Sequence, residues 1–418
     1  MTDVVVVGGG LAGLVAARRL ADRGADVTLF ERRAEVGGRV RSREVDGFTL
    51  DRGFQVMFTS YPAVREELDL DRLGLRFFSP GATIARPAHR STLSDPLRDP
   101  WSAVESALNT DVTLRDKLLV LKLRRELGKT VPDTVFRGPD QSIREYLDRW
   151  GFSDRFVENF AAPFYGGITL DRSLSTSAAV FQYTFAMLSQ GATAIPAEGM
   201  GAISDQLARR AGRAGVTIET ETPVEAVESD EGGVTVETPG ETVSADAAVV
   251  ATDPKAAAEL TGVDAPTEGR GSVTQYFAMG RRSLDTGRKL ILNAVDSRPN
   301  QVAPLSAVAS EYAPAGRTLL SATTLGHPDE SDEELATAVE DALASWYPEH
   351  SFTDLELLAT DRIEFAQFDQ PPGFYDDLPA VDDPDGSVYL AGDYTQWSSI
   401  QGALESGQVA AATVADDR

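Results

Sequence analysis

Apolar runs and amphipathic stretches alternate along the first sixty residues and predict a strand–helix–strand unit. Residues 4–7 are four consecutive valines, the pattern of a strand buried on both faces. An amphipathic run then extends to residue 23 and predicts a helix, and residues 27–30 predict a second short strand. Residues 40–50 alternate weakly, as the two strands of a hairpin do. This order predicts the start of an α/β domain.

Similar strand patterns return in the middle and at the end of the chain. The predicted strands there lie at residues 216–219, 224–228, 234–237, 247–251 and 388–391. A helix of small residues begins near residue 398, soon after the last of these strands, and reaches residue 413. We therefore expect one α/β domain that is discontinuous in sequence and is assembled from residues 1–60, 196–262 and 380–418.

The segments between these blocks, residues 61–195 and 263–379, predict a second, α+β domain that holds the substrate. Within it, residues 114–127 read LRDKLLVLKLRREL, the pattern of an amphipathic helix. This helix carries two of the five lysines in the chain, and Lys129 follows just beyond it. Residues 114–129 therefore form either a solvated helix face or a docking surface for an anionic membrane, to which each basic residue could add ~1 kcal/mol.

A second helix of the same domain is apolar throughout. Residues 177–188 read SAAVFQYTFAML, with aromatic residues at positions 181, 183 and 185. Such a helix either belongs to a buried core or forms one wall of an apolar substrate cavity.

A glycine motif stands at the turn between the first strand and the first helix. Gly8, Gly10 and Gly13 have the spacing GxGxxG, and Glu31 ends the second strand, 18 residues after the last glycine. In this context Gly8 allows the tight turn, Gly10 lets a pyrophosphate approach the backbone, and Gly13 lets helix and strand pack closely. The carboxylate of Glu31 would bond ribose hydroxyls. The motif predicts a Rossmann-like dinucleotide site, and the alternative is a glycine-rich turn without a ligand.

Two further motifs extend this site. Gly37, Gly38 and Arg39 follow shortly after the acidic residue. Near the other end of the chain, Gly392 and Asp393 end the last strand, and the next helix presents its positive dipole end. A second site of this kind suits a long cofactor whose far end develops negative charge.

Composition narrows the class of protein. The chain has 418 residues, too many for one core, so two domains are expected. Its formal net charge of -26 and its scarcity of lysine predict a proteome adapted to high salt, a halophilic protein, although a GC-rich genome also favours arginine over lysine. A nucleic acid is not an expected partner, because phosphate neutralisation needs a basic face.

The chain offers few groups for metals, crosslinks or membrane anchors. It has no cysteine, which excludes disulfides, thiolate metal sites and cysteine-linked cofactors. His89, His327 and His350 lie far apart and show no metal-ligand spacing, so no metal site is expected. The amino terminus enters a strand directly, and no apolar run approaches the ~20 residues of a membrane span. We expect a cytoplasmic protein, soluble or peripherally associated with a membrane.

Together these motifs resemble the flavin amine oxidase superfamily, which includes monoamine and polyamine oxidases, protoporphyrinogen oxidases and phytoene desaturases. The resemblance implies noncovalent FAD, with Glu31 and Arg33 at the adenosine end and Arg39 near the pyrophosphate. It also implies that Asp393 contacts the pyrophosphate–ribityl region and that the helix near Ile400 faces the pyrimidine edge of the flavin. The cofactor residues that it implies are Gly8, Gly10, Leu11, Ala12, Gly13, Glu31, Arg33, Gly37, Gly38, Arg39, Val224, Gly392, Asp393, Ile400, Gln401 and Ala403.

The resemblance implies an oxidoreductase that removes a hydride from a C–H bond of an apolar small molecule, as desaturases and dehydrogenases do. The alternatives are an amine oxidase with oxygen as acceptor, a non-redox flavoenzyme resembling the sugar mutases, and a binding protein without chemistry. Amine oxidases tend to place an aromatic residue just before a glutamate where this chain has Ile400 and Gln401, which favours the desaturase-like reaction. The flavin carries the chemistry, so the pocket candidates are Trp397, Gln55 and Lys289 rather than a catalytic base.

Overall fold

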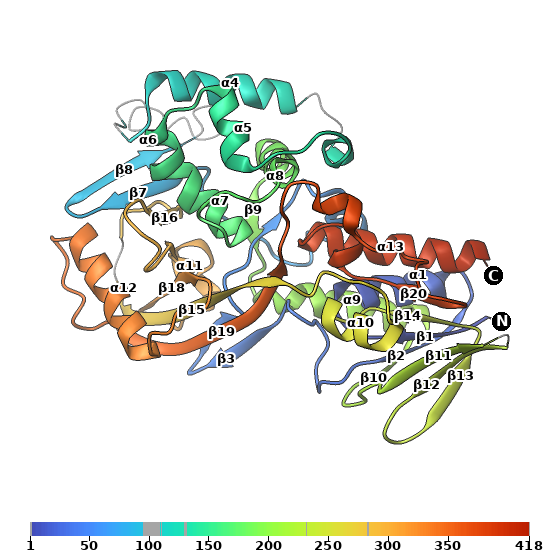
Figure 1. The fold of residues 1–418 in the computed structure, drawn as a ribbon. Helices are drawn as coiled ribbons and strands as arrows, with labels where there is room; N and C mark the ends of the chain where they lie inside the picture. The colour runs from blue at the N-terminus through green and yellow to red at the C-terminus, as the bar shows by residue number, and fades with distance from the viewer. Residues whose placement is uncertain are drawn as a thin grey trace.

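The computed structural model describes residues 2–94, 109, 111–128, 132–230, 232–281 and 284–417 (Figure 1). Lys129, the last residue of the predicted membrane-docking segment, lies outside the described residues. Two bodies of secondary structure meet in the molecule. One is a parallel sheet with its helices, at the right of Figure 1, and the other is a larger sheet with a group of helices, at the left and top.

The predicted Rossmann-like sheet is present and all its strands are parallel. In spatial order they are β10 (Thr217–Glu219), β2 (Asp26–Phe30), β1 (Asp3–Val7), β14 (Ala247–Val250) and β20 (Val388–Leu390). All three sequence blocks assigned to this domain contribute strands. The central strand β1 has neighbours on both sides, and its four valines are at most 3% exposed. Helix α1 (Leu11–Asp22) packs between α9 (Gly201–Ala214) and α13 (Ile400–Asp417).

A small antiparallel sheet is attached beside the parallel one (Figure 1). It consists of β11 (Ala226–Asp230), β12 (Gly233–Glu237) and β13 (Thr242–Ala245), with α10 (Pro254–Thr261) nearby. The sequence pattern did not predict β13. Its residues are half-buried or exposed and only Val243 is strongly apolar, so the strand has no hydrophobic alternation to reveal it.

The second body is built on a seven-stranded sheet. Its strands, in spatial order, are β19 (Glu356–Phe368), β15 (Gly269–Gly280), β18 (Arg317–Leu325), β17 (Gln301–Ala303), β16 (Leu290–Asn293), β7 (Ala82–Arg86) and β8 (His89–Leu93). Helix α12 (Asp332–Trp346) covers one face, where its Val339 and Leu343 share a core with Phe277 and Leu320 of the sheet. The opposite face is turned toward the rest of the molecule.

A group of helices gathers at the top of Figure 1. It contains α4 (Leu114–Leu127), α5 (Ile143–Trp150), α6 (Asp154–Phe156), a π-helical turn (Val157–Ala161), α7 (Ala162–Thr169) and α8 (Ala178–Gln190). Helix α4 has the bounds expected from the sequence, because Thr113 and Asp116 form a capping box at its start. Helix α8 is largely buried, as its apolar sequence predicted.

The remaining elements are short and connect these bodies. They are β3 (Ser42–Val45), β4 (Phe48–Asp51), β5 (Met57–Phe58), α2 (Pro62–Glu67), β6 (Arg76–Phe77), β9 (Thr193–Ile195), α11 (Leu305–Val308) and single helical turns at Pro132–Phe136, Ser310–Tyr312, Phe374–Asp377 and Asp393–Thr395. Although α2 follows the expected boundary at residue 60, its buried Glu67 binds Arg18 of α1 and Gln408 of α13. These contacts attach α2 to the parallel-sheet domain.

Asp51 joins the two bodies through a buried carboxylate. Its side chain accepts hydrogen bonds from Ser42 Oγ at 2.6 Å, the backbone N–H of Met200 at 2.8 Å and Tyr312 Oη at 3.0 Å. Its backbone carbonyl accepts a fourth, at 2.6 Å, from Tyr276 Oη of β15. Burial raises the pKa of Asp51 to about 6, because these bonds only partly replace its lost hydration.

We expect the stability of the protein to depend on Asp51 between pH 5 and pH 7. The folded state binds the carboxyl proton more tightly than the unfolded chain does, so the stability from this proton is present at low pH and is lost as the pH rises through about 6. Urea unfolding measures this effect. The free energy of unfolding of wild type, relative to that of Asp51→Asn, should fall by about 1 kcal/mol from pH 5 to pH 7. A difference that stays constant across this range would contradict a raised pKa.

Candidate functional site

A cavity of about 1330 Å³ runs between the parallel-sheet domain and the helical group. At one end it is lined by the glycine turn and Glu31, and at the other by aromatic residues of α7, α8 and the segment before them. We call these ends the cofactor arm and the aromatic arm. The cavity is continuous, so a ligand in one arm can touch a ligand in the other.

The three motif glycines have different surroundings. Gly8 has a φ of 110°, and a Cβ there would lie 2.6 Å from the carbonyl oxygen of Ala251. A Cβ on Gly13 would lie 2.0 Å from the carbonyl oxygen of Gly8, so this glycine is needed for helix and turn to pack. A Cβ on Gly10 would meet no atom of the described residues within 4 Å, although Gly10 lines the cavity. The fold therefore keeps the space beside Gly10 open, as a pyrophosphate requires.

Glu31 is held rigidly at the edge of the cofactor arm. The side chain is 5% exposed, and its two oxygens accept hydrogen bonds from the backbone N–H groups of Gly9 at 2.8 Å and Arg33 at 3.0 Å. Each oxygen can still accept a further bond from a ribose hydroxyl. Arg33 and Val224 line the same arm.

The second glycine pair folds back onto the first turn. The N–H of Gly37 donates to the carbonyl oxygen of Gly9 at 2.7 Å, and Gly37 and Gly38 both have positive φ angles. Arg39, next in the chain, forms an ion pair of 2.5 Å with Asp393. Burial tends to lower the pKa of Arg39, but the attraction of Asp393 outweighs it and raises the pKa, so the guanidinium stays charged. The pair joins the amino-terminal and carboxyl-terminal motifs inside the cofactor arm.

The carboxyl-terminal motif completes the cofactor arm. The N–H of Gly392 donates to Ser406 Oγ at 2.8 Å, and Asp393 accepts a further bond from Ser398 Oγ at 2.8 Å. Ile400 and Ala403, in the first turn of α13, line the cavity. The positive end of this helix therefore lies at the cavity wall.

Two predicted cofactor residues lie behind the cavity wall rather than on it. Gly13 supports the packing of α1, as described above. Gln401 is 2% exposed: its Oε1 accepts from the N–H of Ala63 at 2.9 Å, and its Nε2 donates to Glu405 at 3.1 Å. Its side chain attaches α13 to α2 and does not line the cavity, which argues against a contact with a cofactor. The other predicted cofactor residues line the cavity, namely Gly8, Gly10, Leu11, Ala12, Glu31, Arg33, Gly37, Gly38, Arg39, Val224, Gly392, Asp393, Ile400 and Ala403.

The structure adds residues to the cofactor arm that the sequence did not reveal. Ala251, Thr252 and Asp253 line it beside Gly8, where β14 ends next to β1. The sequence could have indicated these residues, because they end or follow a predicted strand, and the carboxyl ends of neighbouring parallel strands share one edge of the sheet. The cofactor arm as a whole suits a dinucleotide. It has open space at Gly10, the carboxylate of Glu31 for a ribose, and the cation of Arg39 beside the phosphate position.

A ladder of phenylalanines lines the aromatic arm. Phe152, Phe156, Phe160 and Phe164 follow one another at intervals of four residues, with ring centroids 4.5, 5.5 and 5.2 Å apart. The rings continue through α7 and α8 to Phe185. Residues 177–188 thus satisfy both alternatives, because they form a buried helix that is also a cavity wall. The i, i+4 spacing of the four phenylalanines could have predicted the ladder from the sequence.

The aromatic arm offers no acidic partner for a cation. Among the described residues between 54 and 193 that line the cavity, none is aspartate, glutamate or histidine. The charged residues there are Lys117 and Arg124, both on α4. Burial raises the pKa values of Tyr61 and Tyr165, so these phenols stay neutral. The arm is therefore suited to an uncharged, apolar ligand.

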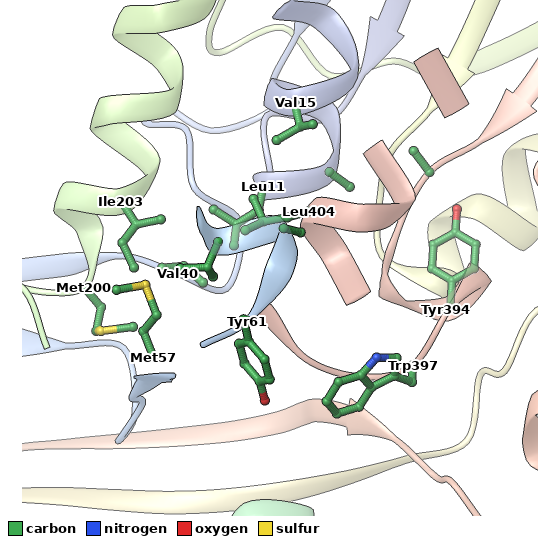
Figure 2. Packing of buried hydrophobic residues seen from close by; sticks show 14 of the residues in the cluster. Leu11, Val15, Val40, Met57, Tyr61, Met200, Ile203, Tyr394, Trp397 and Leu404 are labelled. Atoms are coloured by element: carbon green, nitrogen blue, oxygen red, sulfur yellow. The ribbon is translucent and has the colours of Figure 1, made fainter. Parts of the chain in front are cut away.

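The three pocket candidates differ in placement. Trp397 lines the cavity and packs against Tyr61, with ring centroids 6.1 Å apart (Figure 2). It also packs against Tyr183, with ring centroids 4.9 Å apart. Gln55 also lines the cavity, but its Nε2 donates to the carbonyl oxygens of Arg39 and Arg52 at 2.9 and 3.1 Å. Lys289 is buried just before β16 and does not line the cavity, so the structure argues against a pocket role for it. The described residues hold no cluster of three side chains that could bind a metal.

Comparisons with known proteins agree with this geometry. The family described as flavin containing amine oxidoreductase matches residues 11–415. Carotenoid 3,4-desaturase of Haloarcula japonica is 30% identical over 60% of this chain and 56% of its own length, so the match spans about half of that relative. Carotenoid phi-ring synthase of Streptomyces griseus is 30% identical over 93% of this chain and 82% of its own length. An oxidoreductase from Methanosarcina mazei shares the fold, with a TM-score of 0.74 at 19% identity over 97% of this chain and 99% of the other. The chain belongs to the flavin-containing amine oxidoreductase family, as its paired glycine motifs indicated.

Proposed function

We propose that the protein is an FAD-dependent oxidoreductase that removes a hydride from a C–H bond of an apolar substrate, as a desaturase does. The observation that carries this proposal is the aromatic arm, which is free of carboxylates in the described residues and opens directly into the cofactor arm. FAD, when bound, supplies the hydride acceptor. Two of the relatives are named for reactions on carotenoids, which are apolar polyenes.

The chain's own residues bind and orient rather than react. Glu31 would bond the ribose hydroxyls of the adenosine, and Arg39 would balance the charge of the pyrophosphate. The start of α13 would face the pyrimidine edge, where the positive end of the helix dipole would stabilise negative charge. The phenylalanine ladder excludes water and aligns an extended apolar chain. The chain has no cysteine, so the flavin is held without a thioether link.

The proposal is tested by purifying the protein and mixing it anaerobically with candidate substrates. We expect a bound flavin whose visible absorbance is bleached by phytoene and is unchanged by putrescine or benzylamine. Bleaching by an amine, with peroxide released on admitting oxygen, would instead assign amine oxidation. Protein that folds but binds no FAD would exclude the redox proposal altogether.

A membrane contact through α4 is the second part of the proposal. Leu114, Leu118 and Leu121 form one stripe along this helix and are 74%, 61% and 43% exposed. Basic residues flank the stripe in a chain of net charge -26, which suits an anionic bilayer. Leu114 and Leu121 also line the cavity, so the stripe lies where an apolar substrate would enter. None of the helices in the described ranges is long and apolar enough to cross a bilayer.

We expect Leu118→Glu to weaken binding to anionic phosphatidylglycerol vesicles at least tenfold. The substitution removes apolar contact and adds a charge of the same sign as the lipid, together costing about 2 kcal/mol. Co-sedimentation with vesicles measures the effect, and flavin content should not change because Leu118 does not line the cavity. Val295→Glu is the matched control: Val295 is 57% exposed, and it belongs to the segment between β16 and β17 rather than to α4. Equal binding of both variants would exclude α4 as the contact.

A further inference from the structure

Three polar residues form a row across the seven-stranded sheet. Thr274 of β15 lies directly opposite Thr323 of β18, and Thr323 lies directly opposite Gln301 of β17. Directly opposed residues project from the same face of a sheet. All three line the cavity, whereas the neighbouring Gln275 points to the other face and donates to a carbonyl oxygen of α12. The row therefore faces the interior of the cavity.

The hydrogen-bonding capacity of this row is largely unused. Thr323 is 4% exposed, and its Oγ1 has no hydrogen-bond partner among the described residues. Thr274 is fully buried, and its Oγ1 accepts a bond of 3.4 Å from the N–H of Phe54. Gln301 Oε1 accepts from Asn300 Nδ2 at 2.9 Å, and no hydrogen bond donated by its Nε2 is found in the described part of the chain. The row thus presents two hydroxyl groups, which can donate and accept, and an amide donor toward the cavity, where a buried polar group without a partner costs free energy.

The surroundings of the row select the charge of its ligand. Asp361 of β19 lies directly opposite Thr274, where it binds Arg43 and the N–H of Gly53. Arg43 is already paired with Asp361, so it is not a free counter-ion for a carboxylate on the ligand. An ammonium group would need a carboxylate to balance its charge at this buried place, and Asp361 is already paired with Arg43. An uncharged oxygen on the ligand can accept hydrogen bonds from the hydroxyl and amide donors of the row, and it brings no charge into the cavity.

We propose that Thr274, Thr323 and Gln301 bind an uncharged oxygen, a hydroxyl or a carbonyl, on an otherwise apolar substrate. The row fixes the position of the substrate along the cavity, so it selects oxygenated molecules over the parent hydrocarbons. This inference rests on the proposed function and names the substrate class more closely.

The test compares two fluorescent polyenes, diphenylhexatriene and its hydroxymethyl derivative, by titration of the FAD-loaded protein. Wild type should bind the hydroxymethyl derivative at least tenfold more tightly than the hydrocarbon. Thr323→Val keeps the shape of the side chain and removes the hydroxyl, so it should bring this ratio close to one without weakening the hydrocarbon. Its melting temperature should not fall, because the lost hydroxyl has no partner in the protein. Thr324→Val, on the opposite face of β18, is the matched control and should leave the ratio unchanged.

The two proposals fail in different ways. If wild type binds both polyenes equally, or if Thr323→Val weakens both equally, the polar row does not recognise oxygen, whatever the flavin does. The flavin could instead never be bleached by a polyene while the hydroxymethyl derivative still binds more tightly through Thr323. That result would support oxygen binding by the row and exclude the proposed reaction. A melting temperature lowered by several degrees in Thr323→Val would show that the hydroxyl serves the fold instead of a ligand.

Discussion

Replacing Gly10 with alanine is expected to abolish flavin retention and to leave the apoprotein folded. A Cβ at this position meets nothing within 4 Å among the described residues, and the backbone there is extended, so alanine fits the protein itself. The added methyl group fills the space through which the pyrophosphate reaches the N–H groups at the start of α1. We expect the dissociation constant of FAD to rise about a hundredfold, or about 2.7 kcal/mol.

The neighbouring glycine should behave differently. Alanine at Gly13 would place its Cβ 2.0 Å from the carbonyl oxygen of Gly8, so the first turn must separate from α1. We expect Gly13→Ala to destabilise the apoprotein by about 1–3 kcal/mol or more, as overpacking does, and to lower its melting temperature. Gly10→Ala should melt with the wild-type apoprotein.

Flavin content after gel filtration and thermal unfolding of the apoproteins separate these effects. Gly212→Ala is the control, because Gly212 is an exposed residue within α9 whose Cβ would meet nothing within 4 Å among the described residues. This change should keep the flavin and add about 0.5–1 kcal/mol of stability, since alanine favours the helix. If Gly10→Ala retains FAD with wild-type affinity, the cofactor does not approach the turn as proposed.

The cofactor arm was predictable from sequence because its requirements are local. Gly8, Gly10 and Gly13 each meet a constraint set by one turn between a strand and a helix, and Glu31 follows one strand later. The same locality explains why the bounds of α4 were predicted well, since its capping box is contained in four residues. Adaptation to high salt, which the composition suggested, stays a prediction.

Long-range contacts account for what the sequence could not reveal. Gln401 stands in a recognisable motif, yet its side chain accepts a hydrogen bond from the backbone N–H of Ala63, 338 residues earlier in the chain. Thr274, Thr323 and Gln301 carry no common pattern, and only the register of three strands brings them into one row. Lys289, a pocket candidate from the sequence, is buried before β16 and does not line the cavity.

The carboxyl-terminal helix is expected to be as necessary for the flavin as the glycine turn. Helix α13 lies against α1, and Figure 2 shows its fully buried Leu404 beside Leu11. The contact depends on Gly407, because a Cβ there would lie 2.4 Å from the carbonyl oxygen of Ala12 and 2.9 Å from the Cβ of Val15. Leu11 and Ala12 line the cofactor arm, so a displacement at this contact changes both halves of the cofactor site.

We therefore expect Gly407→Val to lower flavin affinity at least tenfold, because the larger side chain pushes the first turn of α13 out of register with α1. Deleting the residues after Leu390 removes Asp393 and the whole of α13 and should abolish flavin retention. Since that deletion could also unfold the domain, Gly407→Val is compared with Ala415→Val, which adds bulk on the exposed side of the same helix. Flavin titration and far-ultraviolet circular dichroism are measured for all three. A folded truncated protein that keeps its flavin would show that the carboxyl-terminal motif does not hold the cofactor.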